Sequence, residues 1–378
     1  MTETVTKRTG TKCLWLKRNA VLVIAFLAAV VSAAFVPPDA IYASYFDVKT
    51  LSCLFGTLAV VCALKNISFF SILAARIIRL TGSSRWAALT LVYITFIGSM
   101  LIANDMALIT FLPLGYYVFS TAGRKWETAV VFILQNIAAN LGGMLTPFGN
   151  PQNLYLYSHY NIPTGEFIRI MAPPFAVSIF LISLCCLLIP RHSLRVSVRD
   201  GKNRLPKLRT AAYLALFALT ILMVFRVLPP AVTIAVVVVS LLFLDRRVFT
   251  LVDYGLLMTF VFFFIFAGNM SRLEQVSAFF SGLLQKNTLL TGVASCQVIS
   301  NVPSAILLSG FTDNFVSLLT AVNIGGTGTL IASLASLITF REFTGRYKNS
   351  AGGYLWRFTL FNFSFLAVLT LFCLWIGR

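Results

Sequence analysis

The sequence predicts an all-α fold: a polytopic membrane helical bundle of two inverted repeats, each with a re-entrant hairpin and an interrupted transmembrane helix. Of its 378 residues, 58% are hydrophobic and 11% are charged, and the mean hydropathy is +0.87. Apolar runs of about spanning length recur along the chain, which is typical of integral membrane proteins. Two segments, 140–157 and 323–340, share a pattern of small and polar residues, which indicates a duplication.

Apolar runs bounded by proline, glycine and charged residues predict the individual helices. The run at 20–36 follows a basic segment, but it is long for a signal peptide and has no clear cleavage site, so it predicts a retained first span. The expected spans are 19–36, 50–65, 86–103, 106–121, 126–146, 167–189, 211–227, 231–244, 254–270, 315–340 and 354–376, with a shorter apolar stretch at 288–310.

A basic linker, 190–209, divides the chain into a first repeat, 1–189, and a second repeat, 210–378. Positively charged loops stay in the cytoplasm. We therefore expect a multi-pass protein of the inner (plasma) membrane with a cytoplasmic N-terminus. The net charge of +18 lies in such loops, so it does not predict nucleic-acid binding. The basic residues concerned are Lys7, Arg8, Lys12, Lys17, Arg18, Arg191, Arg195, Arg199, Lys202, Arg204, Lys207 and Arg209.

The two similar segments are expected to cross the membrane in opposite directions. Arg124 and Lys125 stand before the first segment. The second segment is followed by Arg341, Arg346 and Lys348. If both clusters are cytoplasmic, the repeat is inverted, and an exchange of conformations between its halves would give alternating access. Aligned without gaps, the segments are identical at Asn140/Asn323, Gly142/Gly325, Gly143/Gly326, Thr146/Thr329 and Leu154/Leu337.

Each half also contains a short polar stretch, a further interruption of the apolar sequence, before its repeated segment. Between Lys286 and Asp313 there are too few residues for two spans of about 20 residues each, which predicts a re-entrant hairpin with Ser300 and Asn301 at its tip. The first-half stretch, 86–121, is long enough for either two full spans or a hairpin. Both readings are open from the sequence.

The segment 145–153 predicts an opened helical turn that binds a ligand. Pro147 and Pro151 each remove a backbone donor, and Gly149 permits unusual dihedral angles. Freed carbonyls can bind Na⁺, and free amides at the restarted helix attract an anion. A proline kink with internally satisfied side chains is the structural alternative. The candidate residues are Thr146, Gly149, Asn150, Gln152 and Asn153, and in the second copy Asn323, Thr329 and Ser333.

Asp105 is an acid within an apolar stretch, where a charge is costly and predicts a function. It could carry a proton or bind a cation, or it could cap a helix as a neutral carboxyl. The other candidates at the two polar interruptions are Asn104, Ser300, Asn301 and Ser304, and the candidate Na⁺ ligands are Asn104, Asn150 and Asn301.

Three motifs, ANDMALITFLPL at 103–114, NLGGMLTPFGNPQN at 140–153 and SNVPSAILLS at 300–309, resemble the ion transporter superfamily. That superfamily groups arsenite efflux pumps, sodium/proton antiporters and divalent-anion/sodium symporters, including citrate and dicarboxylate carriers. The resemblance covers nearly the whole chain. It implies two hairpins that meet two unwound helices near mid-membrane, elevator-type movement of that unit, and commonly a homodimer. Dicarboxylate carriers have Ser-Asn-Thr at each hairpin tip, whereas Asp105 and Val302 replace both threonines here.

Together these features predict a secondary active transporter (permease) of a small anion, an organic carboxylate, coupled to Na⁺ or H⁺. The expected partners are that anion, membrane lipid and a second copy of the chain, with no cofactor and no metal site. A sodium/proton antiporter or arsenite exporter is the near alternative, and an ion channel a more remote one. An enzyme is not expected, because the sequence lacks membrane-embedded paired aspartates, a Ser/His pair and HExxH.

Overall fold

The computed structural model describes residues 19–120, 125–193 and 205–378, and the regular structure within these ranges is helical apart from one isolated bridge, Ser83 to Ser193. Seven of the described helices are long and apolar enough to cross a membrane. The predicted all-helical polytopic bundle is thereby confirmed, while the inverted relation and the domain boundaries stay predictions. Several of the basic residues from which the cytoplasmic loops and the crossing directions were predicted lie outside the described ranges. They are Lys7, Arg8, Lys12, Lys17, Arg18, Arg124, Arg195, Arg199, Lys202 and Arg204.

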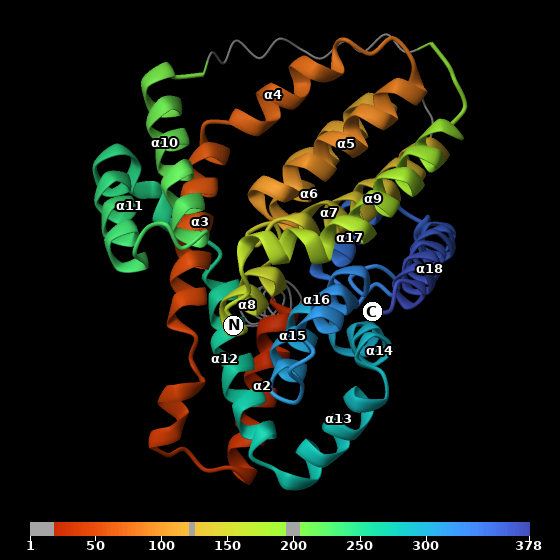
Figure 1. Cartoon of the computed structure of the whole chain (residues 1–378). Helices are drawn as coiled ribbons and strands as arrows, with labels where there is room; N and C mark the ends of the chain where they lie inside the picture. The colour runs from red at the N-terminus through yellow and green to blue at the C-terminus, as the bar shows by residue number, and fades with distance from the viewer. Residues whose placement is uncertain (1–18, 121–124, 194–204) are drawn as a thin grey trace, which may run out of the picture.

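Figure 1 shows the helices in chain order. The first half contains α2 (Ala20–Phe35), η1 (Ala40–Tyr45), α3 (Val48–Asn66), α4 (Phe69–Ile78), α5 (Ser84–Ile102), α6 (Asn104–Ser120), α7 (Lys125–Gly142), η2 (Gly143–Leu145), α8 (Pro151–His159) and α9 (Thr164–Leu187). The second half contains α10 (Lys207–Val224), α11 (Pro230–Asp245), η3 (Arg246–Thr250), α12 (Tyr254–Ser271), α13 (Glu274–Lys286), α14 (Thr288–Ile299), α15 (Asn301–Ser309), α16 (Phe315–Ile324), α17 (Leu334–Arg346) and α18 (Ala351–Trp375).

Most of the expected spans agree with these helices to within a few residues. The stretch expected at 315–340 is interrupted into α16 and α17, and the apolar stretch at 288–310 forms two short helices, α14 and α15. Three helices, α4, α8 and α13, were not among the expected spans. They are short, at 10, 9 and 13 residues, so none produces an apolar run of spanning length.

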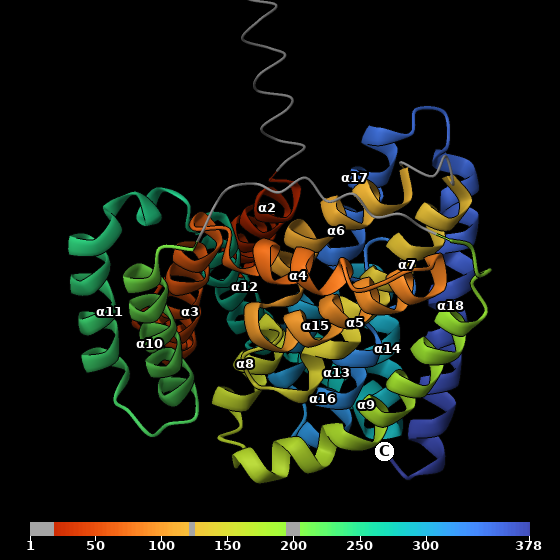
Figure 2. The same cartoon turned by 90° about the horizontal axis from the view of Figure 1, so that it is seen from above.

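The helices form a central group with a flanking group beside it. On one side α3 packs with α10 and α11, while α2 packs along α12 (Figure 1 and Figure 2). In the centre α5, α6 and α7 pack together, as do α14, α15 and α16. Across the halves, α15 packs on α8 and α6 packs on α17. The pair α5–α6 therefore contacts α17, and the pair α14–α15 contacts α8. We call the break between α7 and α8 the first interruption and the break between α16 and α17 the second interruption.

The chain reverses direction at two tight tips, Ala103 between α5 and α6 and Ser300 between α14 and α15. Ala103 has φ 63° and ψ 151°, and Ser300 has φ 75° and ψ 158°. Residues other than glycine rarely adopt this backbone region, which costs about 1–3 kcal/mol. The same strained geometry at both tips makes α5–α6 and α14–α15 two helical hairpins of the same kind. That 84–120 is re-entrant stays a prediction, because α5 is itself long and apolar enough to cross a membrane.

An asparagine stabilises each tip. Asn104 Oδ1 accepts a hydrogen bond from the backbone N–H of Asp105, and Asn301 Oδ1 accepts one from that of Val302, both at 2.9 Å. These bonds satisfy N–H groups in the first turns of α6 and α15, which have no partner within a helix. The two asparagines thus have the same local role in the two halves.

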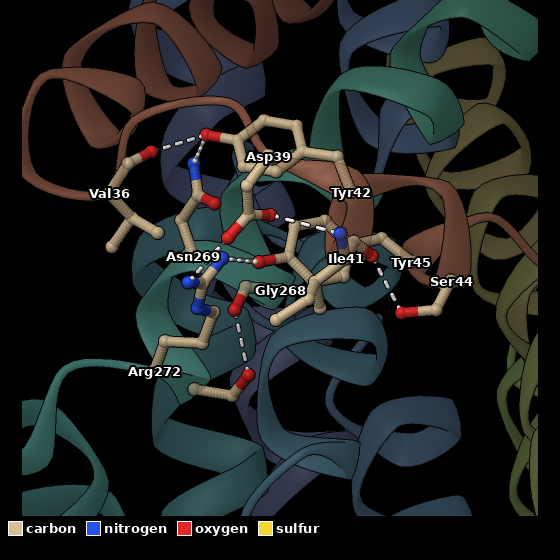
Figure 3. A network of polar contacts seen from close by, with 10 residues as sticks. Val36, Asp39, Ile41, Tyr42, Ser44, Tyr45, Gly268, Asn269 and Arg272 are labelled. Atoms are coloured by element: carbon tan, nitrogen blue, oxygen red, sulfur yellow. Dashed lines mark hydrogen bonds and ion pairs between the residues drawn. The ribbon is translucent and has the colours of Figure 1, made fainter.

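A polar clasp fixes the segment between α2 and α3 to the end of α12 (Figure 3). Arg272 donates to Asp39 Oδ2 at 2.7 Å and to the Tyr45 hydroxyl at 3.2 Å. Beside it, Asn269 Nδ2 donates to Ser32 Oγ at 3.0 Å and to the Tyr42 hydroxyl at 2.9 Å. The clasp closes the end of the α2–α12 pair.

We expect the clasp to make stability fall in acid. The hydrogen bond from Arg272 holds the pKa of the Asp39 carboxyl below its ordinary value of 3.8. A lowered folded-state pKa contributes stability above the unfolded pKa, and that contribution is lost as pH falls through the folded pKa. Arg272→Gln should therefore show a smaller loss of Tm below about pH 4 than the unmodified protein. Identical acid dependence in the two proteins would contradict this assignment.

Candidate functional site

Both hairpin tips border one small cavity of about 40 Å³, which is room for roughly two or three water molecules. Asn104 and Asp105 line it from the first tip, and Ser300 and Asn301 line it from the second. The α2–α12 pair closes the cavity, with Thr259 among its lining residues. The structure thus brings residues that are nearly 200 positions apart in the sequence to one point.

Four helices begin at this cavity. Their first residues, Asn104 of α6, Pro151 of α8, Asn301 of α15 and Leu334 of α17, all line it. Each helix N-terminus carries roughly half a positive charge and unpaired N–H groups, which favour an anion. Among the lining residues within the described ranges there is no lysine or arginine. Any attraction for an anion here therefore comes from helix ends, amides and hydroxyls.

Three side-chain oxygens of the same region are buried without a hydrogen-bond donor: Asp105 Oδ1, Asn150 Oδ1 and Gln152 Oε1. Asp105 and Gln152 line the cavity, and Asn150 directly precedes the first residue of α8. Leaving such an acceptor unpaired costs about 1–3 kcal/mol. Because all three are oxygens, the group that satisfies them must be a donor or a cation. The site thus combines a positive field from helix ends with a set of oxygen ligands.

Asn153 holds the first opened turn in shape. Its Nδ2 donates to the carbonyls of Gly143, Met144 and Thr146 at 3.0, 3.3 and 3.2 Å. Pro147 and Pro151 prevent a continuous helix here, as expected. Gly149 does not have a positive φ, contrary to the expectation of unusual dihedral angles. Glycine is needed because a Cβ would lie 2.3 Å from the carbonyl oxygen of Gly143.

A chain of asparagine side chains that starts at the cavity-lining Asn104 connects the two halves. Asn104 Nδ2 donates to Asn140 Oδ1 at 3.3 Å, and Asn150 Nδ2 donates to the Asn140 carbonyl at 3.1 Å and to Asn323 Oδ1 at 3.3 Å. Asn323 Nδ2 in turn donates to Asn153 Oδ1 at 2.6 Å. All five asparagines are buried, so the network fixes the first hairpin and both interruptions relative to one another.

Equivalent threonines bind each hairpin to its interruption. Thr146 Oγ1 donates to the Met100 carbonyl at 2.9 Å, and Thr329 Oγ1 donates to the Gln297 carbonyl at 3.0 Å. Met100 and Gln297 each lie three residues before a hairpin tip. This matching pair of bonds follows the alignment of Thr146 with Thr329 made from the sequence.

Some sequence-predicted site residues line the cavity and others build its walls. Ser304 Oγ bonds to Ser295 Oγ at 2.8 Å inside the second hairpin, and Ser333 Oγ accepts from the backbone N–H of Ser336 at the start of α17. Their role as ligands stays a prediction. The lining residues are Asn104, Asp105, Gln152, Ser300 and Asn301, and those behind the lining are Thr146, Gly149, Asn150, Asn153, Ser304, Asn323, Thr329 and Ser333.

Sequence reasoning missed two amides that hold this region together, Asn140 as the connecting residue and Gln297. Gln297 lies in α14 and reaches across to the second interruption. The one feature of the sequence that could have revealed Gln297 is that it is an amide within an apolar run, three residues before the Ser300 tip. The α2–α12 wall was also missed, because nothing local in those helices indicates that they face the hairpins.

A family profile described as "Citrate transporter" matches residues 11–316, which include both hairpins and the whole first interruption. The chain belongs to the citrate transporter family. An uncharacterized transporter of Methanocaldococcus jannaschii is 32% identical to it over 303 residues, which are 79% of this chain and 82% of that protein. The inner membrane protein YbiR of Escherichia coli is 31% identical over 330 residues, 85% of each chain.

A more distant relative covers less of this citrate transporter family member. The magnetosome protein MamN of Paramagnetospirillum magneticum is 30% identical over 166 residues, which are 42% of this chain and 37% of that protein. The family and the two longer matches make the chain a multi-pass membrane transporter. The resemblance to the ion transporter superfamily drawn from the sequence is confirmed.

Proposed function

We propose that the protein is a secondary active transporter of a small organic carboxylate, coupled to Na⁺ or H⁺, that works by alternating access. The observation that carries the proposal is the convergence of four helix N-termini on one cavity together with unpaired acceptor oxygens. Helix ends suit a carboxylate, and the oxygens suit a cation. A site that holds both charges at once couples the movement of one ion to that of the other.

In this arrangement the carboxylate binds to backbone N–H groups and to hydroxyl and amide side chains of the two tips. Ser300 and Asn301 supply such groups from the second tip, and Gln152 supplies its amide from α8. A carboxylate beside an ionised Asp105 would be repelled, because both groups are negative. A bound Na⁺ or a proton on Asp105 removes that repulsion, so the cation must bind for the anion to bind.

Alternating access requires the cavity to open. At about 40 Å³ it is too small for an organic carboxylate, so we interpret this conformation as closed. The α2–α12 pair forms one wall, and Arg226, from the segment after α10, donates to the carbonyls of Tyr157 and Ile162 near the end of α8. Movement of the hairpin-bearing unit past this flanking group must break the Arg226 contacts.

The same proposal includes an inner-membrane location with a cytoplasmic N-terminus and a homodimer. A sodium/proton antiporter or an arsenite exporter is the second candidate, and the buried oxygen of Asp105 favours it. In that case the acid exchanges cations and no carboxylate binds. A channel would differ from both in giving non-saturating flux without counterflow.

Uptake into proteoliposomes tests the proposal directly. We expect saturable accumulation of one labelled anion from a panel of citrate, succinate, malate, sulfate and arsenite, driven by an imposed Na⁺ or H⁺ gradient. Liposomes without protein, and gradients collapsed by an ionophore, are the controls. Proton flux driven by a Na⁺ gradient, with no movement of any anion, would establish the antiporter instead.

A further inference from the structure

The second interruption, between α16 and α17, is filled by a side chain from the neighbouring hairpin. Gln297 Nε2 donates to the carbonyls of Gly325 and Thr327 at 2.9 and 3.1 Å. Its Oε1 accepts the backbone N–H of Thr329 at 2.9 Å. One carboxamide thus satisfies two carbonyls and an amide that the opened helix leaves unpaired.

Gly328 leaves room for this side chain. It has a φ of +120°, and a Cβ added there would lie 2.1 Å from Gln297 Oε1. Any other residue would be strained and would push the carboxamide out. The backbone of the second interruption is therefore shaped around Gln297.

Carbonyl oxygens freed by an opened helix are the usual ligands of a small cation in a transporter. At the second interruption the positive end of the Gln297 amide dipole occupies that place. The Asn153 amide does the same for the carbonyls of the first interruption, so the two halves differ in their side-chain oxygens instead. The buried oxygens without partners that surround the cavity all belong to the first half: Asp105, Asn150 and Gln152. Among the described residues of the second tip and the second interruption, no buried side-chain oxygen lacks a partner.

We propose that the Gln297 carboxamide is a built-in substitute for a cation in the second half, so that the coupling ion binds only at the unpaired side-chain oxygens of the first half. This inference rests on the proposed cation coupling and adds its stoichiometry: one coupling cation at the hairpin tips in each cycle. The second hairpin keeps its position on the second interruption with or without an ion. In the first half, an ion at Asp105 adds to the bonds that the asparagine network already makes.

Replacing the amide with an acid tests this proposal. In Gln297→Glu, one carboxylate oxygen can still accept from Thr329, while the other meets the carbonyls of Gly325 and Thr327 with no hydrogen to donate. Three oxygens, one of them charged, then face one point, and oxygens are the ligands that hard cations prefer. We expect Na⁺ to bind at the second interruption of this variant and to stabilise it, which Na⁺ does not do at that place when Gln297 is intact.

The measurement is Tm of the purified full-length protein in detergent, with NaCl titrated against choline chloride at constant ionic strength. The background is Asp105→Asn, which removes the first-half carboxylate. Asp105→Asn alone should show no Na⁺-specific rise in Tm, whereas Asp105→Asn/Gln297→Glu should show a rise of about 2 °C or more. Gln285→Glu is the matched control, because Gln285 is exposed on α13, and it should add no Na⁺ response.

Gln297→Ala is a milder second variant that frees the same carbonyls without adding charge, and it serves if the acid variant does not fold. We expect Na⁺ to raise the Tm of this variant by less than it raises the Tm of the Gln297→Glu variant, with no such rise in choline chloride. Na⁺-specific stabilisation in Asp105→Asn with Gln297 intact would overturn the proposal, because a cation would then bind outside the first-half site. Absence of any Na⁺ response in both Gln297 variants would also overturn it. Since no carboxylate is present in this assay, its failure is distinct from failure of carboxylate uptake.

Discussion

Asp105→Asn is expected to lose coupled accumulation while the protein stays folded. Asparagine has nearly the same shape and keeps one oxygen, but it has neither a charge nor a titratable proton. An interaction with a charged group is worth about 1.5–3 kcal/mol. If Na⁺ is the coupling ion, its half-saturating concentration should therefore rise roughly 10- to 150-fold. If H⁺ is the coupling ion, uptake driven by a pH gradient should disappear.

The measurement is initial uptake rate in proteoliposomes against external Na⁺ or pH, with Tm as a check on folding. Asp313→Asn is the matched control, because Asp313 is exposed in the turn before α16 and should leave the cation dependence unchanged. An Asp105→Asn protein with an unaltered cation dependence would rule out Asp105 as the coupling residue. Loss of pH-linked cation flux in a protein that moves no anion would support the antiporter.

Gly142→Ala is expected to destabilise the protein strongly. Gly142 ends α7 where that helix crosses α5, and a Cβ would lie 2.2 Å from the Phe96 carbonyl oxygen and 2.6 Å from Ser99 Oγ. The nearest atom belongs to the backbone, so α5 must move away from α7. Overpacking of this kind costs about 1–3 kcal/mol. Because α5 is the first arm of the hairpin that carries Asp105, uptake should also fall.

The control is Gly282→Ala on α13, where nothing lies within 4 Å of the added Cβ. That change should be neutral or stabilise by up to about 1 kcal/mol, because alanine favours helix over glycine. Thermal unfolding of the two purified variants compares them directly. A Tm for Gly142→Ala that equals that of Gly282→Ala would show that α5 and α7 separate easily.

Much of the cavity could be predicted from the sequence because its signals are local. Prolines at 147 and 151 interrupt a helix whatever surrounds them. An acid at 105 and the amides at 104 and 301 are conspicuous in apolar runs. Asn104, Asp105, Gln152, Ser300 and Asn301 were selected on this basis, and all five line one cavity.

Other features could not be predicted because they depend on contacts between distant segments. Gln297 was overlooked since its three backbone partners lie about 30 residues away in the chain. The hydroxyls of Thr146 and Thr329 were chosen as ligands. The structure shows that they donate to hairpin carbonyls, a contact the sequence did not indicate, and their role as ligands stays a prediction. A polar side chain in an apolar run must find a partner, and the sequence does not state which one.

The sequence by itself determined the membrane class, the all-helical fold, the two polar interruptions in each half and the family, because these follow from composition, proline placement and motifs. Only the tertiary structure decided that both tips and four helix N-termini share one cavity, and that an amide fills the second interruption. The physical reason is that hydrogen bonds and helix-end fields act through space. Their strength depends on distances that packing alone sets.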